Sequence, residues 1–139
     1  MDAAYELAVA IFGRLRADAA VSGFVVGRVY DRVPSDPKPA YPYVSLGPSD
    51  ATQDDAECIE GQEVSIQIDC WSSGDGEAYG SAEVRKLSGA IRKCLHGAEF
   101  TLAENAFVML DHRITRVMRD LDGVTNHAAM TFSAFVETN

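Results

Sequence analysis

The sequence predicts an α+β fold, with an antiparallel or mixed sheet of four to five strands, two helices packed on one face and a long C-terminal hairpin. Residues 3–16 and 77–96 carry apolar side chains at helical spacing, and residues 63–71 alternate between apolar and polar side chains. Residues 106–137 contain two strand patterns around a turn signal. A chain of 139 residues has the size of one domain, and we expect residues 1–139 to form it.

The first helix is expected over residues 3–16. Asp2 is its predicted N-cap, because a side-chain oxygen at that position can accept a backbone N–H of the first turn. Steps of three and four residues place one apolar stripe along the helix, which we expect to face the core. The stripe consists of Tyr5, Ala8, Val9, Phe12 and Leu15.

After this helix the chain is expected to be extended. Residues 28–33, RVYDRV, are a candidate for a short strand. All five prolines lie between residues 34 and 48, and because proline lacks a backbone N–H and disfavours helix, we expect a loop that enters an edge strand at residues 43–47. Residues 49–57, SDATQDDAE, are polar and acidic and are predicted to form an exposed, mobile loop.

A half-buried strand and the second helix follow. Strict alternation over residues 63–71 predicts a buried face made of Val64, Ile66, Ile68 and Cys70. The helix is expected over residues 77–96 and should stop at Gly97, since glycine readily adopts the left-handed conformation that ends helices. Its predicted core stripe is Val84, Leu87, Ile91, Cys94 and Leu95.

The stretch RDLDGVTNH admits two interpretations, a calcium loop or a tight turn. An EF-hand loop that began at Asp120 would need glycine at its sixth position and glutamate at its twelfth, where the sequence has Thr125 and Thr131. A type I turn favours aspartate at its first position and glycine at its fourth, which this stretch matches. We therefore interpret Asp120, Asp122 and Gly123 as a structural turn and predict no metal site.

This turn implies a register for the hairpin of residues 106–118 and 125–137. If Asp120 faces Val124, one face of the hairpin is apolar and the other mostly polar. The apolar pairs would be Ile114–Met130, Leu110–Ala134 and Val108–Val136, with His112–Phe132 on the same face. The other face would hold Arg113–Thr131 and Asp111–Ser133. The predicted core combines Ile66, Ile68, Val84, Leu87, Ile91, Leu110, Ile114, Met130 and Phe132.

Candidate catalytic groups are few. His96 ends a helix, where the helix dipole favours an imidazolium, and His112 and His127 lie on strands with opposite facing, so they should not converge. Cys70 is expected to face inward, where a thiol behaves as a small hydrophobe. No nucleophile-elbow, P-loop or zinc-protease motif occurs. We predict no enzyme activity, no catalytic residue and no cofactor.

Charge and cysteine spacing narrow the class of protein further. The net charge is −9, with an isoelectric point near 4.6, whereas binding to a nucleic-acid backbone needs a basic face. There is no apolar run of about 18 residues and no basic segment typical of a signal peptide, so we expect no membrane span and no export signal. Three cysteines without a Cys-x-x-Cys motif indicate reduced thiols in a cytosolic protein.

Several stretches, in order along nearly the whole chain, together resemble one known family. RVYDRVPSDPKPAYPYVSLG resembles its early strand and Pro-Tyr-Val entry into the next strand. IQIDCWSS and GEAYGSAEVRKLSGAIRKCL resemble its strand ending in Trp-Ser and its long helix. MRDLDGVTNHAAMTFSAFVE resembles its closing hairpin. The family is that of the tail-completion, or tail-terminator, proteins of long non-contractile phage tails and gene-transfer-agent particles.

The resemblance implies a structural role without a cofactor. Such proteins form a ring, commonly a homohexamer, that caps the head-proximal end of the tail tube, ends tube polymerisation and joins the tail to the head connector. The partners would be other copies of the chain, the tail tube protein and the head–tail connector protein. DNA would pass through the lumen without specific binding. The protein would be cytoplasmic during assembly and then part of the particle.

Two alternatives stay open. One is a head–tail joining protein of the same particle. The other is a small ligand-binding or enzymatic domain, which would need a pocket that gathers Asp111, His112 and Arg113, although alternation sends His112 to the opposite face. Our candidates for contacts with other subunits or with the tube are Asp50, Asp54, Asp55, Arg116 and Arg119.

Overall fold

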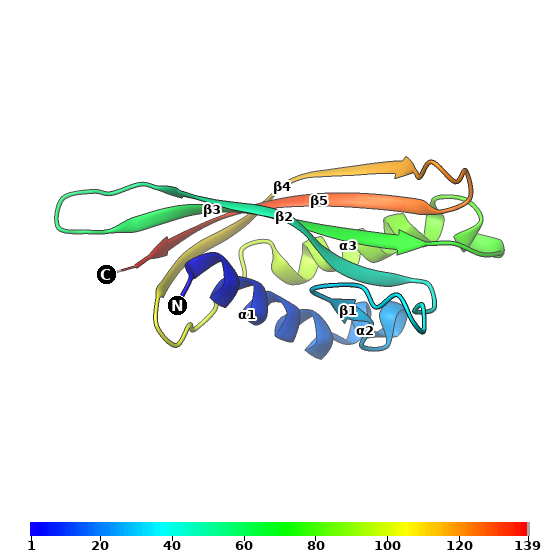
Figure 1. Ribbon diagram of the computed structural model, residues 1–139, viewed down its shortest axis with the longest axis horizontal. Helices are drawn as coiled ribbons and strands as arrows, with labels where there is room; N and C mark the ends of the chain where they lie inside the picture. Colours follow the sequence, from blue (N-terminus) through cyan, green and yellow to red (C-terminus); the bar gives the residue numbers. More distant parts are fainter. Residues whose placement is uncertain (139) are drawn as a thin grey trace.

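The computed structural model describes residues 1–138 and shows a long twisted sheet with all helices on one face (Figure 1). Its layers confirm the α+β class, with five strands and a third helix beside the two that the sequence predicts. In chain order the elements are α1 (Ala3–Ala17), α2 (Ala19–Val25), β1 (Val29–Tyr30), β2 (Tyr43–Gln53), β3 (Gly61–Ser72), a 3-10 turn η1 (Gly76–Ala78), α3 (Ala82–Leu95), β4 (Ala106–Arg119) and β5 (Asn126–Glu137).

The strands lie in the order β1-β2-β3-β5-β4. The short β1 runs parallel to β2, and every other pairing is antiparallel, so the sheet is mixed. Because β1 contributes two residues, most of β2 is an open edge, and β4 is the open edge on the other side. The sheet therefore has two different strands, β2 and β4, with one open edge each.

Helix α1 begins where the sequence predicts. The Asp2 carboxylate accepts the backbone N–H of Tyr5 at 2.8 Å, which satisfies one of the free donors of the first turn. The predicted stripe is wrong at Tyr5 and Val9, which are exposed, whereas Leu7 and Ile11 are fully buried. The helix is apolar around most of its circumference, so its periodicity allows two faces, and packing selects the one with the larger aliphatic side chains.

Helix α2 is not predicted by the sequence. Its seven residues are too few to show a helical period. It begins at a second aspartate cap, where Asp18 accepts the backbone N–H of Val21 at 3.0 Å. It ends at Val26, which adopts the left-handed conformation with φ 49°. The cap at Asp18 was the available sequence signal.

Residues 49–53 are strand, which corrects the prediction of a mobile loop over 49–57. Strand β2 continues to Gln53 and pairs with β3 along its length. Pro48 interrupts neither strand, because it lies in a bulge between Leu46 and Ser49 where no ladder N–H is required. The exposure of this segment is as predicted, and Figure 1 shows the β2–β3 hairpin extending beyond the helices.

Helix α3 begins five residues later than predicted, after the 3-10 turn. It ends as predicted, with Gly97 in the left-handed region at φ 72°. All four of the predicted inward residues of β3 are buried, and so are four of the five stripe residues of α3. Cys94 is only partly buried, although it packs against the core.

Two bulges in β4 change the predicted register of the closing hairpin. The pairs Leu110–Ala134, Asp111–Ser133 and His112–Phe132 are confirmed. On either side of them the pairing shifts by one residue. The observed pairs are Thr115–Met130 and Ile114–Thr131 towards the turn and Phe107–Val136 at the other end, in place of Ile114–Met130, Arg113–Thr131 and Val108–Val136.

The shift overturns one of the core predictions. Ile114 follows the bulge after His112 and is 43% exposed, because the extra residue turns its side chain to the outer face. The other predicted core residues are buried, and Leu7, Ile11 and Leu15 of α1 complete the cluster that they form. The core thus lies between the inner face of the sheet and the three helices.

Candidate assembly surfaces

The outer face of the sheet, which no helix of residues 1–138 covers, carries a row of aromatic side chains across four strands. Tyr30 of β1 contacts Tyr43 of β2, with ring centroids 6.0 Å apart, and Tyr43 lies 6.4 Å from Trp71 of β3. Trp71 stacks on His127 of β5 at 3.9 Å with an angle of 10° between the rings. Burial raises the pKa of Tyr43 to about 12, which keeps its hydroxyl neutral.

Polar contacts hold this aromatic row in place. The carboxylate of Asp69 is 2.7 Å from Nε2 of His127 and accepts a hydrogen bond from Nε2 of Gln67 at 2.9 Å. The indole N–H of Trp71 donates to Ser45 Oγ at 2.9 Å. Asp69 is 6% exposed, so its charge needs these partners. Each polar side chain of this network has a hydrogen-bond partner. Among residues 1–138, the network places no nucleophilic side chain beside His127.

The other two histidines lie on the helix side of the sheet. The backbone N–H of His112 donates to Nδ1 of His96 at 3.0 Å, and Nε2 of His112 is 2.7 Å from Thr115 Oγ1. Burial lowers the pKa of His112, and the nearby charges of Arg92 and His96 lower it further. His112 and His127 thus lie on opposite faces, as their positions in the sequence predict. Nor does the structure gather Asp111 with His112 in one pocket.

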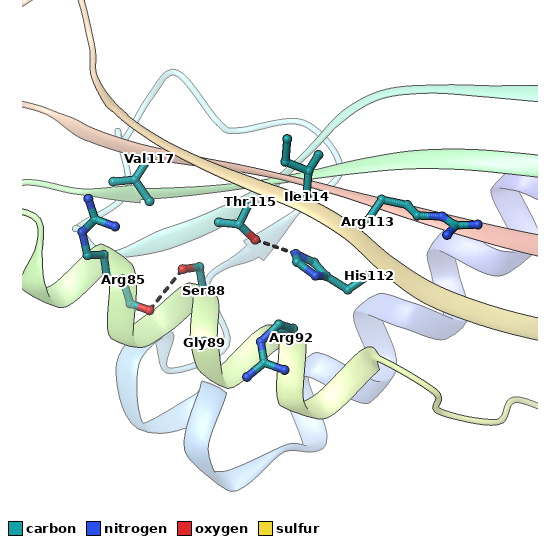
Figure 2. Close-up of a pocket in the computed structure, with 9 residues that line it drawn as sticks. All are labelled: Arg85, Ser88, Gly89, Arg92, His112, Arg113, Ile114, Thr115 and Val117. Atoms are coloured by element: carbon teal, nitrogen blue, oxygen red, sulfur yellow. Dashed lines mark hydrogen bonds between the residues drawn. The ribbon is translucent and has the colours of Figure 1, made fainter.

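A cleft lies between the edge strand β4 and helix α3 (Figure 2). Its volume is about 480 Å³. Arg85 and Arg92 project from α3, and His112 and Thr115 come from β4 above them. Arg113 lies at one end of the cleft, where the second bulge of β4 turns its side chain outward. The cleft is therefore basic, in a chain that is acidic overall.

The β2–β3 hairpin has the opposite charge. Asp50 and Asp54 are exposed and make no side-chain hydrogen bond within the described residues. Asp55 has a structural role, since its carboxylate accepts hydrogen bonds from the Gln53 side chain at 2.6 Å and from the backbone N–H of Gly61 at 3.2 Å. Of the predicted acidic contact residues, two are thus free to meet a partner and one also shapes the hairpin.

The turn at residues 120–125 ends the β4–β5 hairpin. The N–H of Gly123 donates to the carbonyl of Asp120 at 3.0 Å, and Gly123 has φ 76°. The Asp122 carboxylate accepts hydrogen bonds from the Thr125 hydroxyl at 2.6 Å and from the backbone N–H groups of Thr125 at 2.8 Å and Val124 at 2.9 Å. These bonds lower its pKa, the bond from the hydroxyl most of all. Leu121 is fully exposed at the tip, so the turn presents an apolar side chain outward.

The remaining predicted contact residues, Arg116 and Arg119, lie on β4 near this turn. Arg116 pairs with Ala129 in the strand register, and Arg119 donates to the Asn126 side chain at 3.3 Å. Both are exposed, and neither lies beside Asp50, Asp54 or Asp55. Within one copy, then, the predicted acidic and basic contact residues form two separate surfaces.

Sequence reasoning missed the aromatic row and the basic cleft. Both depend on which strands and helices become neighbours, and β3 pairs with β5 across more than fifty residues of chain. The available signals were the single tryptophan and the grouping of arginines in α3 and β4. No set of three metal-ligating side chains is gathered anywhere in residues 1–138, and no helix there is long and apolar enough to cross a membrane.

Comparison with known proteins gives a family match and matches among solved structures. A family model described as "Tail completion protein gp17" matches residues 9–137. Among solved structures, a chain of the "Virion of native gene transfer agent (GTA) particle" has a TM-score of 0.84 and 28% sequence identity, over 99% of this chain and 99% of that chain. No protein with a curated function matches.

Proposed function

The chain belongs to the tail completion protein gp17 family, and on that premise we propose that it forms a ring that caps the head-proximal end of a tail tube. The family match and the likeness to a chain of a gene-transfer-agent virion make it a structural protein of a phage-type or gene-transfer-agent tail. The observation that carries the proposal is the extent of that likeness, which covers almost every residue. We propose that residues 1–139 act as one tail-terminator-like domain.

Two features of the structure support a ring. The sheet ends in two different open edges, β2 and β4, and exposed edges are normally either blocked or used for pairing. Two unlike surfaces on one chain favour a head-to-tail contact, which closes into a ring when the rotation between copies permits. Six copies of a 15.0 kDa chain would have a mass of about 90 kDa.

In the assembled tail the ring would stop tube growth and meet the head connector. A net charge of −9 suits a passage for DNA, since like charge keeps the nucleic acid from adhering. The role requires neither catalysis nor a cofactor.

The proposal is tested by adding the purified protein to tail tubes that lack it. We expect a single ring at one end of each tube by electron microscopy, and no further growth when tube protein is added. Binding at that end without an effect on growth would favour the head–tail joining role. A protein that stays monomeric with tubes, or that coats their whole length, would count against both.

A further inference from the structure

Charge is divided between two regions of the chain. Residues 39–84 contain ten acidic residues and no basic one. Residues 85–119, which include α3 and β4, contain seven of the twelve basic residues. In the fold, the first region supplies the β2–β3 hairpin at one end of the sheet, and the second supplies the cleft at the opposite edge. An acidic chain thus keeps one concentrated basic surface.

Most of these charges are not neutralised within one copy, the exception being Lys86, which pairs with Glu77. In the part of the chain that the structure describes, no arginine lies within ion-pair distance of a carboxylate. The ion pairs there are Met1 with Glu104, Lys86 with Glu77 and His127 with Asp69. Strands β2 and β4 are three positions apart in the sheet, which is about 14 Å, while charges are screened over about 8 Å at physiological salt. The hairpin and the cleft of one copy therefore cannot meet.

We propose that the acidic β2–β3 hairpin of one copy docks in the basic cleft between β4 and α3 of the next copy. The inference rests on the proposed ring and names the contact that closes it. Within residues 1–138, Asp50 and Asp54 have no side-chain partner, and neither do Arg92 and Arg113, which line the cleft. Their complementary charges make a second copy of this chain the occupant that fits.

The open edge of β4 strengthens this assignment. Strand β4 has 14 residues and pairs only with β5 among the described strands. On its outer row the Leu110 carbonyl accepts the Gly97 N–H and the His112 N–H donates to His96, so within residues 1–138 the free backbone groups of that row lie towards the turn, in residues 113–119. A neighbouring hairpin that enters the cleft would cover that edge as well as the arginines. A nucleic-acid phosphate would also suit the arginines, but it would leave the acidic hairpin without a partner.

The contact can be tested by exchanging its charges. One variant carries Asp50→Lys and Asp54→Lys in the hairpin, and the other carries Arg92→Glu and Arg113→Glu at the cleft. All four side chains are exposed, so both variants should fold, which circular dichroism checks. Matched controls place the same charge changes elsewhere on exposed residues. They are Asp31→Lys with Glu99→Lys, and Arg32→Glu with Lys38→Glu.

Assembly is measured by native mass spectrometry and sedimentation, with and without tail tubes. We expect each contact variant to need roughly tenfold more protein for half-assembly than the wild type, and the controls to match the wild type. An equimolar mixture of the two contact variants should assemble again, because each altered hairpin then meets an oppositely charged cleft. That restored ring must alternate the two variants and hold an even number of subunits.

Three results would overturn the contact. Both charge-reversed variants could assemble as readily as the wild type, or the mixture of the two could fail to restore assembly. A short DNA duplex could bind the wild type tightly and lose affinity for the cleft variant while its ring stays intact, which would assign the cleft to phosphate. In all three cases the proposed ring would stand. A wild-type chain that never assembles, even with tubes, would remove the ring and this contact together.

Discussion

At the scale of single residues, a few side chains fix loops that the sheet and helices alone leave free. Glu6 is the clearest case. From α1 its carboxylate accepts the backbone N–H groups of Glu104 and Asn105, both at 3.0 Å, and the Asn105 side-chain amide at 3.2 Å. These bonds tie the loop before β4 to the first helix. Since the loop sets where the edge strand begins, Glu6 helps to position a proposed contact surface.

We predict that Glu6→Gln lowers the melting temperature by a few degrees at pH 7, and that the difference from the wild type shrinks in acid. The hydrogen bonds from Asn105, together with those from the neighbouring backbone N–H groups, hold the pKa of the Glu6 carboxylate below its ordinary value of 4.5. A depressed folded-state pKa gives stability that is present above the unfolded value and lost as pH falls through the folded one. Melting curves at pH 7, 4 and 3 measure this.

The matched control is Glu99→Gln, at an exposed residue whose side chain makes no hydrogen bond within residues 1–138. It should follow the wild type at every pH. A Glu6→Gln variant whose deficit stays constant down to pH 3 would show that the carboxylate charge does not hold the loop.

Gly123 gives a second prediction at this scale. Its φ of 76° is in the left-handed region, which a β-branched residue adopts only at a cost. We expect Gly123→Val to destabilise the chain by about 1–3 kcal/mol, measured by urea unfolding, and Gly123→Asn to cost clearly less. Equal losses for the two variants would mean that backbone strain is not the cause. Neither substitution should change any affinity for calcium.

At the scale of elements, the sequence predicts existence and facing better than ends and register. Alternation in residues 63–71 predicts the buried face of β3 correctly. The test is strict, since an error of one residue would have placed every side chain on the opposite face of the sheet. The hairpin register is right between the bulges and wrong beyond them, since a bulge adds one residue without any composition signal. The exposure of Tyr5 and Val9 has a different reason: tertiary packing, rather than the periodicity of the sequence, determines which face of α1 is buried.

The bulge after His112 makes a prediction that separates the two registers. Leu110 is 1% exposed and Ile114 is 43% exposed. We therefore expect Leu110→Ala to cost about 2–5 kcal/mol in the free energy of unfolding and Ile114→Ala to cost about 0.5 kcal/mol or less. Chemical denaturation of both variants measures the difference. A similar large loss for both would restore the unbulged register, in which both side chains are core.

For the candidate assembly surfaces, too, the sequence predicts local features but not those that depend on long-range strand pairing. The turn residues could be named from the sequence because an Asp-x-Asp-Gly turn is a local pattern. The aromatic row could not, because Tyr43, Trp71 and His127 become neighbours only through long-range strand pairing. Nor could the cleft, since it needs β4 to lie over α3. The predicted acidic and basic contact residues are placed on separate surfaces, a result that only the assembled sheet could give.

At the scale of the whole molecule, the asymmetry of the sheet is the main feature. One end carries an acidic hairpin, the opposite edge carries a basic cleft, and the two cannot meet within one copy. Such a molecule is suited to repeated head-to-tail contact and thus to a closed ring. The family match places this property in tail completion, where a ring at one end of a tube would have a use.

The central claim is tested most directly by electron microscopy of tail tubes mixed with this protein, with the mass of the bound particle measured in parallel. We predict one closed ring on the head-proximal end of each tube, built from copies of the 15.0 kDa chain, and tubes that no longer elongate. Tubes that bind no ring and continue to grow in the presence of the folded protein would contradict it.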